Sequence, residues 1–223
     1  MKRNKDEVIA TKPLPTKGLA LLKDVFFNKF WDLMKLNLLM ITSGLFIITI
    51  PASVTAGSRI IINMLRHEHY YLLSDYWRYF RKEFFASFGG LLFFLAMAFS
   101  AYANYLYLLY FGDSLLGIIL VLIGIVIMIL FYISGYHYFC LLVFVDLKFS
   151  ALMKNAWLLA MTGFGKNSLV VIVLMLWLGI HIFGLPFTFL LLPMITFSWP
   201  LLLTTYNAYG NIATYVLKKE EEE

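Results

Sequence analysis

Long apolar runs separated by short polar segments form the pattern of this chain. They extend from Phe30 to Leu217 and are broken by prolines, glycines and polar turns. A helix needs about 20 apolar residues to cross the ~30 Å hydrocarbon core of a bilayer. Breaking the runs at these points predicts membrane helices over about 31–50, 52–66, 87–111, 115–145, 168–184 and 187–217. The predicted fold is all-α: a polytopic bundle of about six transmembrane helices in three hairpins, with cytoplasmic amphipathic helices.

The first run, from Phe30 to about Leu65, is too long for one membrane helix. As a single helix it would measure ~54 Å, at about 1.5 Å per residue. We expect the chain to fold back at its proline, which cannot continue the hydrogen-bond ladder of a helix. Small residues would let the two arms pack closely there. This predicted structural turn comprises Pro51, Ala52, Ala56 and Gly57. The second arm, 52–66, either spans the membrane or forms a re-entrant piece that protein buries.

Two polar segments, 67–86 and 147–167, lie between the apolar hairpins. In the first, aromatic residues recur at helical spacing and cationic residues take the other face, which predicts an amphipathic helix over about 72–85. We expect this helix to dock a protein partner or lipid headgroups without crossing the membrane. Its candidate docking residues are Asp75, Trp77, Arg78, Phe80, Arg81, Lys82 and Phe84.

Composition supports a membrane protein. Hydrophobic residues make up 61% of the chain and charged residues 14%, against about 45–50% and about 25% in a typical soluble protein. The net charge is +5, and every Lys and Arg falls within 2–82, 148–166 or 218–219. A nucleic-acid-binding protein would gather its cations on one folded face. Cations that flank apolar spans are typical of cytoplasmic loops, so we expect membrane lipids as partners, no nucleic acid, and cytoplasmic termini.

The chain divides into three parts. Residues 1–29 form a predicted basic cytoplasmic arm, whose end near 18–29 could lie as a short amphipathic helix on anionic headgroups. Residues 30–217 form the transmembrane helical domain, and 218–223 form an acidic cytoplasmic tail. A cleaved signal peptide is the alternative for the start. We do not favour it, because the polar lead is long and more membrane sequence follows.

Few side chains inside the predicted spans could carry chemistry. The intramembrane polar candidates are Arg59, Asn63, His137 and Asn207. Such residues usually face the bundle interior, as relay or substrate groups or as interhelical hydrogen-bond partners. We favour the hydrogen bond for His137. For Arg59 we favour a side chain that extends to the membrane surface over one that neutralises an anionic ligand.

The sequence gives little support for a metal site or for an enzyme activity. His67 and His69 lie two residues apart, so on a helix they would face away from each other, and no third ligand follows at a zinc-like spacing. Cys140 is the single cysteine, which excludes a disulfide scaffold. Known catalytic motifs are missing from the sequence. We therefore expect no enzyme activity, no cofactor and no metal.

Three stretches together resemble the signature of the YesL-type family, small bacterial integral membrane proteins of unknown function. They are Ile50–Gly57, Arg66–Glu68 and Asp75–Phe84, within 45–85. The family pattern has a Pro-Ala-x-x-Ala turn and an acidic-aromatic D-F/Y-W-x-x-F-K/R helix. This chain departs from it at Gly57 and Ser58, where bulkier residues are usual. The resemblance implies a bacterial cell membrane protein associated with carbohydrate uptake, because such proteins are commonly encoded beside sugar ABC permeases. It implies no catalytic residues.

The expected function is therefore a non-enzymatic accessory or assembly subunit of an oligosaccharide ABC importer. Its protein partners would be permease subunits or the ATPase. One alternative is a core permease of a carbohydrate transporter. Residues 155–163 take a place comparable to the ATPase-docking loop of such permeases, but the acid is missing and Leu185-Pro186 lies too far downstream. The other alternative is a membrane scaffold or lipid-binding protein.

Overall fold

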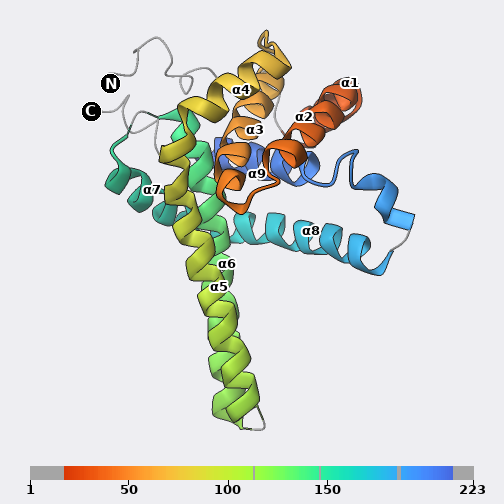
Figure 1. The fold of residues 1–223 in the computed structure, drawn as a ribbon. Coiled ribbons are helices and arrows are strands. Elements are labelled where there is room, and N and C mark those ends of the chain that lie inside the picture. The colour runs from red at the N-terminus through yellow and green to blue at the C-terminus, as the bar shows by residue number, and fades with distance from the viewer. Residues whose placement is uncertain (1–17, 113, 146, 185–186, 213–223) are drawn as a thin grey trace.

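The computed structural model describes residues 18–112, 114–145, 147–184 and 187–212 (Figure 1). Residues 1–17 of the predicted basic arm and the whole predicted tail, 218–223, lie outside the described residues. All regular structure within these ranges is helical. The α-helices are α1 Leu19–Asn28, α2 Phe30–Ser43, α3 Ile50–Leu65, α4 Leu72–Lys82, α5 Phe84–Phe111, α6 Leu115–Phe144, α7 Phe149–Thr162, α8 Phe164–Phe183 and α9 Ser198–Ile212. Two short 3-10 helices are η3 Ile47–Thr49 and η4 Phe187–Leu191.

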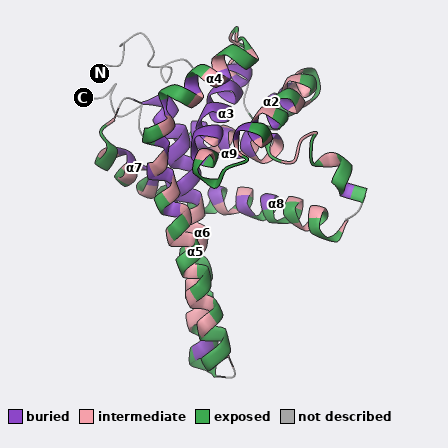
Figure 2. Cartoon of the chain, viewed as in Figure 1, coloured by how far each residue is buried: buried purple, intermediate pink, exposed green. Residues whose placement is uncertain are grey.

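The helices form a packed body and a long projecting hairpin. Figure 1 shows α5 and α6 side by side, extending away from the other helices, and α8 leaving the body sideways. Buried residues gather in α3, α9 and the part of α6 nearest the body, whereas the outer ends of α5 and α6 are largely exposed (Figure 2). Exposed apolar helices of this length suit a lipid environment.

Helix α3 lies at the centre of the body, where two hydrophobic clusters meet. One cluster joins α3 to α1, α2, α4 and α9, and the other joins it to α6, α7, α8 and α9. Small residues on α3 allow the neighbouring helices to pack closely around it. A Cβ atom on Gly57 would lie only 2.6 Å from Cδ2 of Leu201 and 3.2 Å from Sδ of Met40. The predicted close packing around Gly57 therefore involves α9 as well as the preceding arm.

The break in the first apolar run lies earlier than predicted. The helix expected over 31–50 ends at Ser43, and Gly44–Phe46 form the turn before η3 and α3. Pro51 does not end a helix but occupies the first turn of α3. Its missing N–H has no cost there, and its fixed φ favours helix initiation. Helix α2 is consequently only ~21 Å long.

The last predicted helix, 187–217, is also divided. The chain forms η4, then turns over 192–197, and α9 begins only at Ser198. Pro193 lies in the turns and Pro200 in the first turn of α9, so the two prolines delimit a helix and do not kink a continuous one. The other predicted helices, including 87–111 and 115–145, correspond to observed helices with shifted ends.

Four helical segments of the described chain are long and apolar enough to cross a membrane. They are Ile47–Leu65, Phe84–Phe111, Leu115–Phe144 and Phe164–Phe183. The first is mostly buried inside the protein, whereas the others are mostly exposed. The all-helical membrane character predicted from sequence is confirmed, and the count of six spans is not.

Candidate functional site

The aromatic side of α4 packs against the body of its own protein. Tyr76 is fully buried, and its hydroxyl lies 2.5 Å from Oγ of Ser43 on α2 and 2.9 Å from Oγ of Ser53 on α3. Burial raises the pKa of the Tyr76 phenol, although the two serines act in the opposite direction. The predicted amphipathic helix is therefore present, over Leu72–Lys82, with Tyr76 and Tyr79 buried against the body.

Asp75 organises the start of α4. Its Oδ2 accepts a hydrogen bond from the backbone N–H of Tyr71 at 2.8 Å. Its Oδ1 lies 2.9 Å from Nη2 of Arg78, one turn further along the helix. Asp75 thus satisfies an unpaired N–H at the helix start and orients Arg78.

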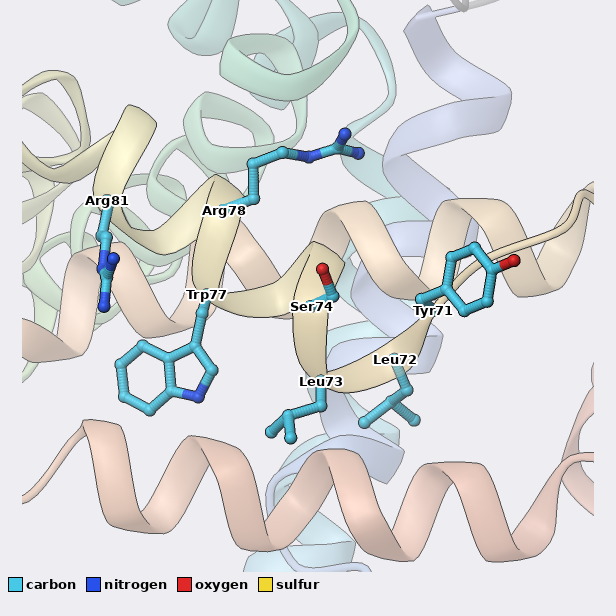
Figure 3. A pocket seen from close by; sticks show the side chains of 7 residues that line it. All are labelled: Tyr71, Leu72, Leu73, Ser74, Trp77, Arg78 and Arg81. Atoms are coloured by element: carbon cyan, nitrogen blue, oxygen red, sulfur yellow. The ribbon is translucent and has the colours of Figure 1, made fainter.

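The outward side of α4 borders an open cleft of about 940 Å³. The cleft is lined by Tyr71, Leu72, Leu73, Ser74, Trp77, Arg78 and Arg81. In Figure 3, Leu73, Trp77 and Arg81 point to one side of the helix, while Arg78 extends to the other. Tyr71 and Leu73 are well exposed, as is the Arg78 side chain. Arg81 forms no ion pair or hydrogen bond with the part of the chain that the structure describes.

The structure divides the predicted docking residues into two groups. Trp77, Arg78 and Arg81 line the cleft. Phe80 and Phe84 are half-buried in a row of rings instead, with Phe80 5.3 Å from Trp77 and 5.9 Å from Phe84 between ring centroids. Lys82 is exposed at the end of α4 but does not line the cleft.

Sequence reasoning missed four of the lining residues. They are Tyr71, Leu72, Leu73 and Ser74, which precede the cationic turn and stand at the predicted start of the helix. Their closeness in sequence to Arg78 and Arg81 was the available signal.

Arg59 and Asn63 lie inside the protein. The guanidinium carbon of Arg59 is 4.8 Å from the centroid of the Tyr79 ring, and Nη1 donates to the carbonyl oxygen of Val143 at 3.3 Å. Arg59 is buried, so the expectation that its side chain extends to the membrane surface is wrong. The stacked and bonded guanidinium joins α3 to α4 and α6. Asn63 is buried one turn further along α3.

The other two intramembrane candidates, His137 and Asn207, belong to one buried polar centre. Its shared atom is Oδ1 of Asn167, which accepts from Nδ2 of Asn207 at 2.6 Å, from Nδ2 of Asn211 at 2.9 Å and from the Tyr136 hydroxyl at 3.1 Å. Nδ2 of Asn211 also lies 3.2 Å from Nε2 of His137. Nδ2 of Asn167 bonds the carbonyl oxygens of Leu159 and Ala160 at 3.1 and 3.3 Å, which brings in α7.

This polar centre joins four helices, and its members satisfy one another. Buried amides that are bonded in this way fix helix positions and leave little capacity for a solute. Asn211 lies four residues after Asn207 on the same helical face, so the sequence already groups the two in one polar stripe. Asn167 gave no such signal, because it stands at the start of an apolar run.

The His67-Glu68-His69 segment lies next to α1. Nε2 of His67 lies 3.5 Å from Oδ2 of Asp24 on α1. Among the residues that the structure describes, no three His, Cys, Asp or Glu side chains converge as metal ligands.

Comparison with known proteins connects the α2–α5 segment to a family. Residues 33–105 match the family described as Protein of unknown function, DUF624. This match confirms the resemblance to YesL-type proteins over that segment. No curated protein and no solved structure matches the chain. The DUF624 segment contains α3, α4 and the cleft-lining residues, whereas the polar centre lies outside it.

Proposed function

We propose that this protein is a non-enzymatic accessory or assembly subunit of an oligosaccharide ABC importer. In this proposal it acts by binding, through the outward face of α4, a permease subunit or the ATPase. The association with carbohydrate uptake rests on the YesL-type resemblance.

One observation supports a binding role most directly: the open cleft lined by Trp77, Arg78, Arg81 and Tyr71. Tryptophan, tyrosine and arginine are the residues that contribute most to protein–protein binding. Tyr76 and Tyr79 are buried in the body and anchor α4, while the cleft-lining side chains of the helix stay accessible. A fixed surface binds with little loss of conformational entropy.

Recovery of partners from native membranes tests this proposal. The full chain, the R78Q/R81Q variant and a K148Q/K154Q variant would be purified in mild detergent, and co-purifying proteins identified by mass spectrometry. Lys148 and Lys154 are exposed on and next to α7, so this pair changes the charge equally away from the cleft. We expect importer subunits with the parent and the α7 control, and their loss with R78Q/R81Q. Equal recovery with both variants contradicts a docking role for the cleft.

The proposal includes a multi-pass location in the bacterial cell membrane with both termini cytoplasmic. The distribution of Lys and Arg supports this orientation. The count of six spans requires the α2–α3 hairpin to cross the membrane. Both termini lie on the same side of the membrane whether this hairpin crosses the membrane twice or enters it and returns without crossing.

A core permease is the competing proposal. It would need a polar path through the bundle near His137 and Asn207. The amides of the polar centre are bonded to one another and to backbone carbonyl oxygens, which favours an accessory or scaffold role. Uptake of labelled oligosaccharide by vesicles that contain only this protein would support the permease instead.

A further inference from the structure

Helices α1 and α2 carry apolar residues on two faces. The inward face is buried and includes Leu21, Leu22, Val25, Leu33 and Leu36. The outward face is exposed and combines large apolar side chains with lysines. The inward face is explained by packing against α3 and α9, and the outward face is not.

The outward residues follow one another at four-residue spacing from α1 into α2. This outward stripe comprises Leu19, Lys23, Phe27, Trp31 and Lys35. Leu19, Phe27 and Trp31 are 74%, 73% and 67% exposed. Residues four apart lie above one another within each helix, and backbone hydrogen bonds from Lys29 to Val25 and from Leu33 to Lys29 connect α1 to α2. Lys35 forms a loose pair with Asp32 at 3.7 Å, and such exposed pairs contribute little.

The stripe continues into an end that is mainly aliphatic and aromatic. Leu38 on α2 is exposed, and so are Leu45, Phe46, Ile47 and Ile48 at the turn before α3. Side chains therefore change from lysine and tryptophan at one end of α2 to mainly hydrocarbon at the other, where the hydroxyl of the exposed Thr42 is bonded to the carbonyl oxygen of Leu38. A bilayer changes in the same order, from headgroups through an interfacial layer that favours tryptophan to the acyl chains.

We propose that the outward stripe is a binding surface for anionic phospholipid. Trp31 and Phe27 lie at the boundary between headgroups and acyl chains, and Lys23 and Lys35 pair with lipid phosphates. A water-soluble partner would not match the aliphatic end of the same surface, whereas a bilayer matches both parts. Basic side chains on a helix with exposed apolar residues bind anionic membranes by this combination of forces.

Depth and lipid selectivity test the proposal in nanodiscs that contain phosphatidylcholine and phosphatidylglycerol. A spin label at position 31 (W31C) would be compared with one at position 69 (H69C) for collisions with oxygen and with a nickel chelate. The native Cys140 is buried, which directs labelling to the introduced cysteine. We expect position 31 to be protected from nickel and accessible to oxygen, and the exposed position 69 to show the reverse. F27C provides a second position on the stripe if W31C folds poorly.

Selectivity for phosphatidylglycerol supplies the second readout. The K23Q/K35Q variant should lose roughly five- to thirtyfold of the preference for phosphatidylglycerol over phosphatidylcholine, since each lysine near an anionic surface contributes about 1 kcal/mol. The K148Q/K154Q control should retain it. The proposal is overturned if position 31 is as accessible to nickel as position 69. An equal loss of preference in both double variants also overturns it, because net charge alone would then account for lipid binding.

Discussion

The amide Nδ2 of Asn211 on α9 lies 3.2 Å from Nε2 of His137 on α6. Nδ1 of His137 lies 2.9 Å from the carbonyl oxygen of Ile133, which can only accept, so Nδ1 carries the proton. Nε2 is then free to accept the hydrogen bond from Asn211. A neutral imidazole thus fixes α9 against α6, and the same Asn211 amide reaches Asn167 on α8.

Asn167→Leu should destabilise the protein by about 1–3 kcal/mol, because it removes the partner of buried donors and acceptors on three other helices, α6, α7 and α9. Unfolding by denaturing detergent would measure the loss. Asn28→Leu is the matched control, since Asn28 is exposed and bonds only Asp24 through its side chain. Similar losses for the two variants would show that the polar centre contributes no special stability.

The sequence predicted the long helices better than the short ones. For α5 and α6, hydropathy alone was sufficient, because each run is long enough to cross and ends at a polar turn. In the first run, Pro51 is equally compatible with the end of one helix and the start of the next. Tertiary contacts determine which of the two forms. One of them is made by Asn37, whose Oδ1 accepts hydrogen bonds from the backbone N–H groups of Phe197 and Ser198. A contact between positions 160 residues apart has no local signature.

Packing around α3 gives the second prediction: Gly57→Leu and Ala56→Leu should each lower folded yield more than His137→Ala does. Ala56 is fully buried, and a Cβ on Gly57 would already clash with Leu201. Overpacking here forces α2 and α9 away from α3, at a cost of about 1–3 kcal/mol or more. His137→Ala removes an interhelical bond worth about 0.6–1.7 kcal/mol, together with buried side-chain volume. Yield would be measured by size-exclusion chromatography in detergent.

Gly179→Leu is the control for this series, because no atom lies within 4 Å of a Cβ at that position on α8. It should retain the parent's yield. If Gly57→Leu also retains it, the small residues of α3 are not required for packing.

Tyr70 links stability to alkaline pH. Its hydroxyl donates to Oδ2 of Asp32 at 2.6 Å, and burial, followed by the hydrogen bond and the charge of Asp32, raises its pKa above 10. The unfolded chain therefore releases this proton first, so stability is complete below pH 10 and declines as pH rises above it. Tyr70→Phe should lower stability at pH 8 and flatten the decline between pH 10 and 11. Thermal unfolding in detergent across this range would measure both effects, and an unchanged slope would assign the decline to other groups.

Periodicity predicted both faces of α4 but not which one the protein covers. Trp77 and Phe80 share an aromatic side with Tyr76, yet only Tyr76 is fully buried. An amphipathic helix can place its aromatic side on a membrane or on its own protein, and the helical pattern is the same in both cases. Only the hydroxyls of Ser43 and Ser53, supplied by two other helices, determine that Tyr76 faces inward.

The turn between α2 and α3 should stay within the bilayer. With Trp31 at the headgroup boundary, the rest of α2, which ends at Ser43, reaches at most ~18 Å below that boundary. The hydrocarbon core is ~30 Å thick, so α2 is too short to cross it. The exposed residues that follow, Phe46 to Ile48, are apolar, so their side chains would be unfavourable in the hydrated headgroup layer on the opposite side. We expect Ile48→Cys to resist a membrane-impermeant maleimide from either side. Ser114→Cys at the end of the α5–α6 hairpin should react from one side and His69→Cys from the other. Reaction of Ile48→Cys from the same side as Ser114→Cys would show that the α2–α3 hairpin crosses the membrane, as six spans require.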